Sequence, residues 1–187
     1  IRKPADLHEA SANGFRKFVF LDASGIALDG TEFAYVALPD GYDYLNEGDL
    51  IGITPSTGHF RSLFRKNSEH NSFFVTERCN HYCLMCSQPP RAVDDEWLLD
   101  EISAALPLVD SETRAFSFTG GEPLLSWQKF IGILSKCHEF LPQTSVHVLT
   151  NGRAFADANV AKAWSDTAHP QLSAGIPIYS AIDYIHD

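Results

Sequence analysis

Up to about residue 70, hydrophobic residues occur in short runs that are separated by turn-forming residues. Four of these runs are rich in β-branched and aromatic residues, and they cover residues 15–21, 32–38, 49–54 and 59–64. Runs of this length, bounded by glycine, proline and aspartate, are typical of β-strands. The pattern therefore predicts a small antiparallel β module over residues 1–70, which carries no recognisable catalytic constellation.

From residue 71 onward, short apolar runs alternate with segments that have a helical period. The expected strands cover residues 72–77, 114–119, 145–150 and 175–180, and the expected helices cover residues 94–109, 127–141 (with Ser126 as N-cap) and 156–168. Strands that alternate with helices at a spacing of roughly 30 to 40 residues indicate βαβ units and a parallel sheet. The sequence thus predicts an α/β fold for residues 71–187.

Composition and charge narrow the class of protein. The 187 residues, of which 44% are hydrophobic and 12% aromatic, suffice for a folded domain with a small appendage. A net charge of −10 repels phosphate backbones, so we expect no nucleic-acid partner, and the basic group of Arg61, Arg65 and Lys66 is more simply a solvated strand face. No apolar run reaches the length of a membrane span, so we expect no membrane partner either.

Three of the four cysteines lie within the segment CNHYCLMC, as Cys79, Cys83 and Cys86. The fourth, Cys137, lies in an amphipathic segment far along the chain. Small secreted proteins held by disulfides are shorter and richer in cysteine than this chain. The cysteine usage therefore favours a reduced, cytoplasmic protein with a metal bound by cysteine.

Two kinds of metal site fit this segment, because thiolate is a soft ligand that suits both zinc and iron–sulfur clusters. A zinc site needs a fourth ligand, and His70 and His81 are near in sequence, but structural zinc sites usually pair two short ligand hooks. An iron–sulfur cube with three cysteine ligands leaves one iron open to a substrate or cofactor. The spacing favours the cluster and leaves zinc as the alternative.

A second candidate segment, FSFTGGEPLL, lies at the end of the next predicted strand. Gly120 and Gly121 let a ligand approach the backbone closely, and the carboxylate of Glu122, before Pro123, can accept hydrogen bonds from an ammonium group. The alternative is a plain turn from strand to helix with an acidic residue near the helix start. GGEP taken alone leaves both interpretations open.

Together, CNHYCLMC and TGGEP resemble the signatures of the radical S-adenosylmethionine (SAM) superfamily, which are CxxxCxxC after the first strand and GGEP after the second. The resemblance covers residues 72–187. It implies that Cys79, Cys83 and Cys86 each ligate one iron of a [4Fe–4S] cluster, whose open iron chelates SAM. The GGEP residues would hold the SAM amino group. An electron, which a donor has to supply, would then cleave SAM to methionine and a 5′-deoxyadenosyl radical that abstracts hydrogen from a substrate.

The resemblance also suggests roles for three further positions. Met85 precedes the third cysteine, where the family often has an aromatic residue, and its thioether would pack near the adenine. Asn151 belongs to an LTNG turn that the family often shows after the third strand; an Asn-Gly turn without a ligand role is the alternative. Ser180 ends the expected fourth strand, where the family often places a ribose contact, and a plain surface hydroxyl is the alternative.

A closer resemblance concerns the substrate. CLMCSQPPR, together with IPIYS and the later pair His186–Asp187, is similar to the radical SAM maturases of the His-Xaa-Ser system. This similarity implies a peptide or small-protein substrate, which the β module is placed to hold. Two alternatives stay open: a radical SAM enzyme acting on a small molecule or nucleotide, and a non-enzymatic cysteine metal-binding module.

The number of predicted strands bears on the extent of the domain. The family barrel usually has six βα units, whereas four strands and three helices are predicted here. We therefore expect the N-terminal part of a radical SAM (β/α) barrel, truncated from a longer chain.

Overall fold

A computed structural model of the chain describes residues 19–22, 34–37, 42, 44–54, 57 and 59–182. Contacts divide the chain into two compact units, Ile1–Asn46 and Glu47–Asp187. The described strands of the first unit are β1 (Val19–Asp22) and β2 (Ala34–Ala37). All other described elements belong to the second unit.

The two strands of the first unit pair in parallel, with Val19 opposite Ala34. The prediction of an antiparallel arrangement was wrong for this pair. Eleven residues separate the strands, close to the dozen or so that a parallel crossover needs and far more than a hairpin turn. The outer parts of the two expected strands, residues 15–18, 32–33 and 38, lie outside the described residues.

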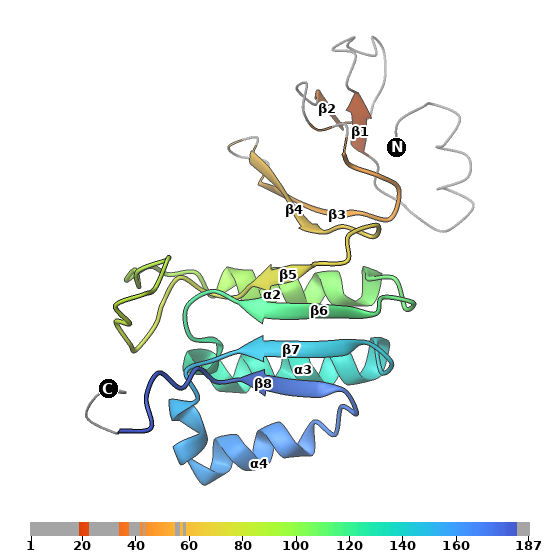
Figure 1. Ribbon diagram of the computed structural model, residues 1–187. Coiled ribbons are helices and arrows are strands. Elements are labelled where there is room, and N and C mark those ends of the chain that lie inside the picture. Colours follow the sequence, from red (N-terminus) through yellow and green to blue (C-terminus); the bar gives the residue numbers. More distant parts are fainter. Residues whose placement is uncertain are drawn as a thin grey trace. The chain divides into compact units, whose positions relative to one another are not determined.

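The second unit combines a β-hairpin with a parallel sheet and its helices (Figure 1). In chain order its elements are β3 (Leu50–Thr54), β4 (His59–Phe64), β5 (Ser72–Phe74), α2 (Trp97–Ala105), η1 (Leu106–Leu108), β6 (Ala115–Thr119), η2 (Pro123–Ser126), α3 (Trp127–Phe140), β7 (Ser145–Leu149), η3 (Arg153–Ala156), α4 (Ala158–Asp166) and β8 (Leu172–Gly175). The sheet has the order β5–β6–β7–β8, and each neighbouring pair is parallel. The predicted α/β fold with parallel strands is confirmed.

β3 and β4 form the antiparallel hairpin that the sequence predicts. Phe64 of β4 is buried and stacks on Phe73 of β5, with ring centroids 6.4 Å apart. Arg61 lies 4.6 Å above the ring of Trp97 and forms an ion pair with Glu101, both on α2. These contacts attach the hairpin to the sheet and its helices, across the boundary near residue 70 that the sequence suggests.

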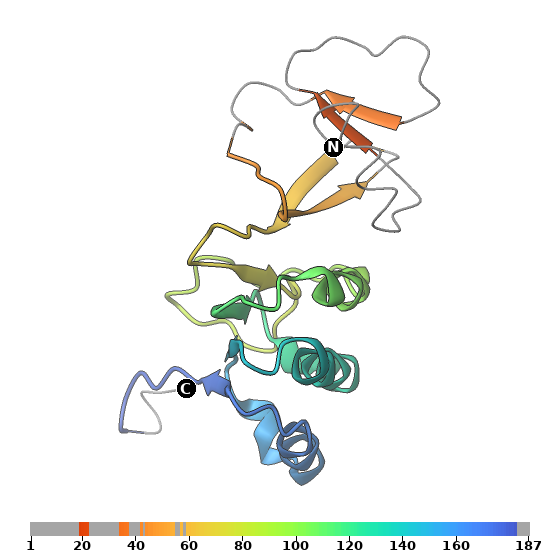
Figure 2. The same cartoon turned by 90° about the vertical axis from the view of Figure 1, so that its right-hand side faces the viewer.

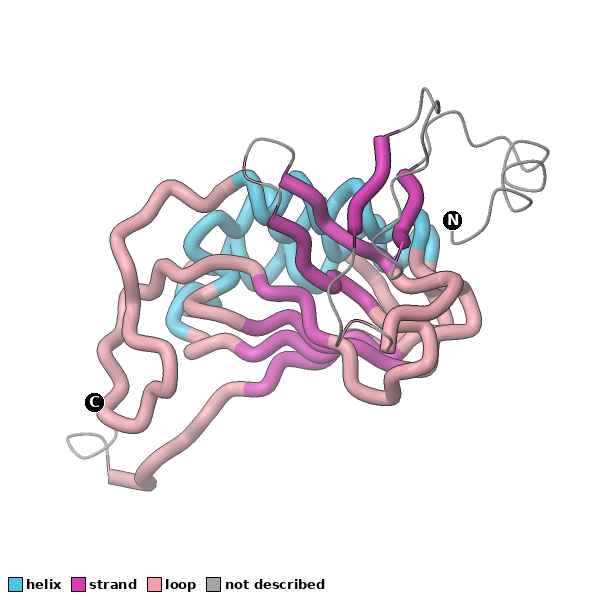
Figure 3. Tube along the Cα trace, turned by 90° about the horizontal axis from the view of Figure 1, so that it is seen from above, coloured by secondary structure: helices cyan, strands magenta, loops and turns pink. Residues whose placement is uncertain are grey.

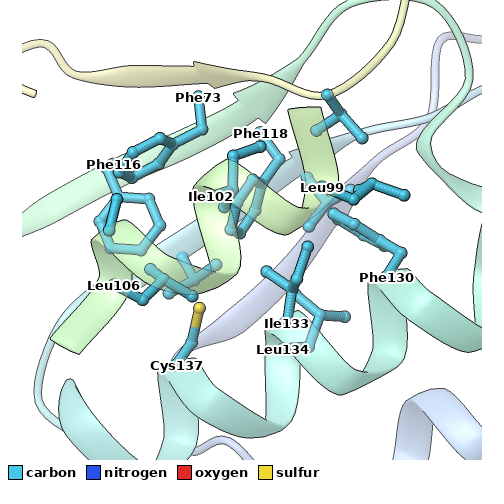
Figure 4. Close-up of a cluster of buried hydrophobic side chains, with 14 of the residues drawn as sticks. Phe73, Leu99, Ile102, Leu106, Phe116, Phe118, Phe130, Ile133, Leu134 and Cys137 are labelled. Atoms are coloured by element: carbon cyan, nitrogen blue, oxygen red, sulfur yellow. The ribbon is translucent and has the colours of Figure 1, made fainter. Parts of the chain in front are cut away.

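One face of the parallel sheet is apolar, and the helices cover it. In Figure 2, α2, α3 and α4 lie together on one side of the sheet. Side chains alternate in burial along β6 and β7, so that Phe116 and Phe118 of β6 point toward the helices. Figure 4 shows this core, where the phenyl rings meet Leu99 and Ile102 of α2 and Phe130, Ile133, Leu134 and Cys137 of α3. Burial of these side chains fixes the sheet against its helices.

The opposite face of the sheet carries polar side chains in register. Ser72, Ser117, His147 and Ser173 lie opposite one another across the four strands. The hydroxyls of Ser72 and Ser117 are 2.6 Å apart, and Nδ1 of His147 is 2.9 Å from the Ser173 hydroxyl. The sheet therefore has an apolar core face and an opposite face that carries these polar side chains.

The expected bounds of the fourth parallel strand were wrong. The fourth parallel strand is Leu172–Gly175, so Gly175 ends the strand that it was expected to begin. The ladder with β7 stops there, two residues before Pro177, which has no N–H to donate. Ser126 occupies the N-cap position of α3, as expected, but its side chain makes no capping hydrogen bond to the helix and its hydroxyl donates to Glu96 instead, at 3.3 Å. Across the described parts of the chain, no helix has the length and apolar character that crossing a membrane requires.

Candidate cofactor-binding site

The segments that follow the four parallel strands lie at one edge of the sheet. The cysteine loop (residues 79–90) comes after β5, and the GGEP turn (residues 120–123) comes directly after β6. Residues 150–153 follow β7, and residues 176–179 follow β8. Because parallel strands end at the same edge, these four segments are neighbours in space (Figure 3). The fold thus brings together the segments that the sequence singled out.

Asp95 ties together the two ends of the cysteine loop. Its buried carboxylate accepts hydrogen bonds from the Thr76 hydroxyl at 3.0 Å, the Glu77 N–H at 2.6 Å and Nε of Arg78 at 3.0 Å. Arg91 adds a second tie, because its N–H donates to the Glu77 carbonyl at 3.0 Å and its guanidinium to the Glu77 carboxylate at 2.7 Å. The base of the loop is therefore held by several charge-assisted bonds.

The GGEP turn packs backbone to backbone against the start of the cysteine loop. The Gly121 N–H donates to the Thr76 carbonyl at 2.6 Å, and the Glu122 N–H donates to the Arg78 carbonyl at 2.8 Å. Gly120 has a φ of +125°, in the region that favours glycine. A Cβ at Gly121 would lie 2.6 Å from the Arg78 carbonyl carbon and closer still to its oxygen. Both glycines are thus required for the turn to reach the loop.

Glu122 is only 1% exposed, and donors from the chain itself surround its carboxylate. Oε1 accepts from the Leu124 N–H at 3.0 Å and from the Thr150 hydroxyl at 2.7 Å. Oε2 accepts from the Asn151 N–H at 2.7 Å. The carboxylate therefore caps η2 and joins the segment after β6 to the segment after β7, a structural task that sequence reasoning missed.

The turn after β7 reaches across to the cysteine loop. Nδ2 of Asn151 donates to Oδ1 of Asn80 at 2.8 Å and lies 3.9 Å from Sγ of Cys79. The Arg153 guanidinium is 3.3 Å from Nδ1 of His81. Gly152 has a φ of +76°, as an Asn-Gly turn requires. The segment is thus both the turn that its sequence suggests and a contact to the cysteines.

These four segments surround a cavity of about 490 Å³. Its lining includes predicted residues from three of them, namely Cys79, Cys83, Cys86, Gly120, Gly121, Glu122 and Asn151. The volume lies within the range of roughly 300–1,000 Å³ that small-molecule sites occupy. Three other predicted residues do not line the cavity: Pro123 is buried at the start of η2, Met85 is 62% exposed, and Ser180 accepts a hydrogen bond from the Ile182 N–H at 3.0 Å.

Sequence reasoning missed several polar residues of the cavity, and Thr150 and Tyr179 are two of them. Each is the neighbour in sequence of a residue that was chosen, Asn151 or Ser180, so the signal was present in the LTNG and IPIYS segments. Desolvation raises the pKa of Tyr179, and the adjacent thiol of Cys83 raises it further. Tyr179 therefore places a phenol beside one of the three cysteines.

The chemistry of the sulfur atoms separates Cys137 from the other three cysteines. All four are free thiols, but burial raises the pKa of Cys137 to about 12, so it does not ionise near neutral pH. Cys79, Cys83 and Cys86 instead face a shared cavity with two glycines that leave room for a ligand. Within the described residues, no group of three or more His, Cys, Asp and Glu side chains converges on a single metal ion. Soft donors around a roomy cavity fit a thiolate-held cluster with a ligand beside it.

The chain is similar to known proteins in its sequence and in its fold. The sequence profile of the Radical SAM superfamily matches residues 73–176, which include the cysteine loop, the GGEP turn and the turn after β7. A crystal structure of BtrN in an open conformation is similar with a TM-score of 0.44 and 18% identity, and the match covers 63% of this chain. The same match covers 52% of the BtrN chain, so this chain spans about half of that protein's length. No curated protein matches the sequence.

Proposed function

Because the chain belongs to the radical SAM superfamily, we propose that it is a radical SAM enzyme whose cofactors bind in the cavity beside the cysteine loop. Members of this superfamily use a [4Fe–4S] cluster and SAM, and they commonly need an electron donor. Together, these cofactors supply a carbon radical that abstracts hydrogen from a substrate. The observation that carries the proposal is that Cys79, Cys83 and Cys86 line one cavity with Gly120 and Gly121.

In this proposal the cysteine loop holds the cluster, and the cavity holds SAM next to it. Cys79, Cys83 and Cys86 are the thiolate ligands, and Asp95 keeps the ends of their loop together. Gly120 and Gly121 form the part of the cavity wall next to the cysteines, where the methionine part of SAM would lie. The protein's own contribution is to bind, orient and enclose the cofactors.

Glu122 keeps the role toward the SAM amino group that its motif implies. An ionised carboxylate offers about four acceptor positions, and the chain's own donors use three of them. We propose that the remaining position, on Oε2, accepts from the SAM ammonium group. The three internal bonds hold the carboxylate rigidly, so its charge is presented without loss of side-chain freedom on binding.

For the substrate, we propose a peptide or small protein, modified in a reduced, cytoplasmic setting. The support is the resemblance of CLMCSQPPR and IPIYS to the maturases of the His-Xaa-Ser system. The first unit and the β3–β4 hairpin precede the range that the superfamily profile matches, so they are additions that could hold such a substrate. The anaerobic assay described below, run with small molecules and with peptides, compares these two classes of substrate.

The test is anaerobic reconstitution of the protein with iron and sulfide, followed by dithionite and SAM. We expect about four irons per chain, broad visible absorbance and release of 5′-deoxyadenosine. Cys83→Ala should abolish the cluster, whereas Cys137→Ala, which removes a buried thiol from the core, should retain it. One zinc per chain without visible absorbance would instead identify a structural or redox-sensing metal module.

A further inference from the structure

We propose that Asn151 positions the cysteine loop and raises the reduction potential of the cluster by donating a hydrogen bond to the sulfur of Cys79. The inference rests on the proposed function, and it assigns Asn151 a task toward the cluster in addition to its place in the cavity wall. The contact joins residues that are 72 positions apart in the sequence.

The orientation of the Asn151 side-chain amide follows from its neighbours. The Arg153 N–H donates to Oδ1 of Asn151 at 3.0 Å, so the carbonyl end of the amide lies on that side. The opposite end, Nδ2, then faces the cysteine loop with two hydrogens. One is directed to Oδ1 of Asn80 at 2.8 Å, and Sγ of Cys79 lies 3.9 Å away. The amide therefore presents a donor to the sulfur.

The backbone of Asn151 is held as firmly as its side chain. Its N–H donates to Oε2 of the buried Glu122, and the Glu122 N–H donates to the carbonyl of Arg78, the residue before Cys79. Thr150 adds a further restraint, because its hydroxyl donates to Glu122 at 2.7 Å and accepts from the Gly152 N–H at 3.0 Å. These hydrogen bonds connect Arg78 to Glu122, Glu122 to Asn151 and Asn151 to Cys79, so the series begins and ends at adjacent residues.

A donor at a ligand sulfur changes the energy of the two redox states unequally. Reduction adds negative charge, part of which resides on the cysteine sulfurs, so a hydrogen-bond donor stabilises the reduced cluster more than the oxidised one. The reduction potential is therefore higher with the donor than without it. A carboxylate at the same position has the opposite effect, because it repels the added charge.

Two substitutions of Asn151 separate the electrostatic effect from the positioning effect. Asn151→Asp retains an oxygen for the Arg153 N–H and retains the main-chain bond to Glu122, but it replaces the donor with a negative charge. Asn151→Ala removes the whole side-chain amide. Asn67→Asp, at an exposed position in the segment that leads into β5, makes the same change of charge before the strand begins, whereas the cysteine loop follows its end, and serves as the control.

The measurement is the midpoint potential of the reconstituted protein, from redox titration followed by electron paramagnetic resonance. We expect a shift to more negative potential in Asn151→Ala, a larger shift in the same direction in Asn151→Asp, and no shift in Asn67→Asp. Full clusters with equal potentials in all four proteins would overturn the inference and leave the proposed function standing. A wild-type protein that takes up no iron would overturn the proposed function and this inference with it.

A second measurement on cluster-free protein tests the positioning effect even if a variant holds no cluster. Asn151→Ala removes the bond to Asn80, so amide hydrogen exchange in the cysteine loop should become several-fold faster, while exchange in α3 stays unchanged. Unchanged exchange in the loop would refute the positioning role.

Discussion

Replacement of Gly121 by alanine tests whether the GGEP turn and the cysteine loop are held together by close backbone contact. The new Cβ would lie 2.6 Å from the carbonyl carbon of Arg78, closer than real side chains approach a backbone. The obstacle is backbone, which cannot turn aside as a flexible side chain does. The turn and the residues before Cys79 would therefore have to separate.

The expected loss of stability follows from the bonds that this separation disturbs. Two backbone hydrogen bonds span the contact, from the Gly121 N–H to Thr76 at 2.6 Å and from the Glu122 N–H to Arg78 at 2.8 Å. Each contributes about 0.5–1.5 kcal/mol net, and a buried partner left unpaired costs about 1–3 kcal/mol, so loosening both gives about 2–4 kcal/mol. Alanine restricts the unfolded chain and returns about 0.4–1 kcal/mol. The free energy of unfolding should thus fall by about 2–3 kcal/mol.

The assay is urea unfolding of cluster-free Gly121→Ala beside the wild type, together with the iron content after reconstitution. Gly132→Ala is the matched control, because a Cβ at Gly132 meets no atom within 4 Å and the position lies inside α3. That variant should gain about 0.5–1 kcal/mol from the better helix propensity of alanine. If Gly121→Ala unfolds within about 0.5 kcal/mol of the wild type and holds a full cluster, the close contact does not organise the site.

Three further predictions concern buried polar groups. In Glu122→Gln, the new NH2 group faces one of the three donors around the carboxylate, so the free energy of unfolding should fall by roughly 1–3 kcal/mol and SAM, measured by calorimetry, should bind about tenfold more weakly. The control Glu139→Gln, at an exposed position, should change neither quantity. A normal unfolding free energy and normal SAM affinity in Glu122→Gln would contradict both roles of Glu122. Iodoacetamide should leave Cys137 unlabelled in folded, cluster-free protein at about pH 8, because burial raises its pKa to about 12, whereas labelling at the rate of the loop cysteines, read by mass spectrometry, would disprove its burial. Burial lowers the pKa of His169 below its ordinary value of 6.5, and its Nδ1 accepts from the Gln171 N–H at 3.1 Å, as only neutral imidazole can. The contribution of His169 to stability is therefore complete above pH 6.5 and is lost as the pH falls from there to the lower folded pKa. Between about pH 7.5 and pH 5.5, His169→Gln should lose less unfolding free energy than the wild type does. An equal loss in the two proteins would refute this.

The sequence alone determined the features that depend on local spacing. The alternation that buries Phe116 and Phe118 recurs every second residue, so the strand and its inner face were predictable. The helical period likewise located α2 and α3 to within a few residues. The spacing of Cys79, Cys83 and Cys86 and the GGEP turn were sufficient to identify the superfamily, because both motifs are continuous in sequence.

The tertiary structure decided everything that depends on which strands pair and on which loops meet. The run after Gly175 has the composition of a strand, yet the strand is the segment before it, because only that segment finds a partner in β7. The orientation of β1 against β2 is likewise a matter of pairing that neither strand's own sequence encodes. Above all, the bonds of Glu122 to Asn151 and of Asn151 to Asn80 and Cys79 join residues 29 to 72 positions apart. Parallel strands bring their carboxyl ends to one edge, and this closeness in space turns three separate turns into one network.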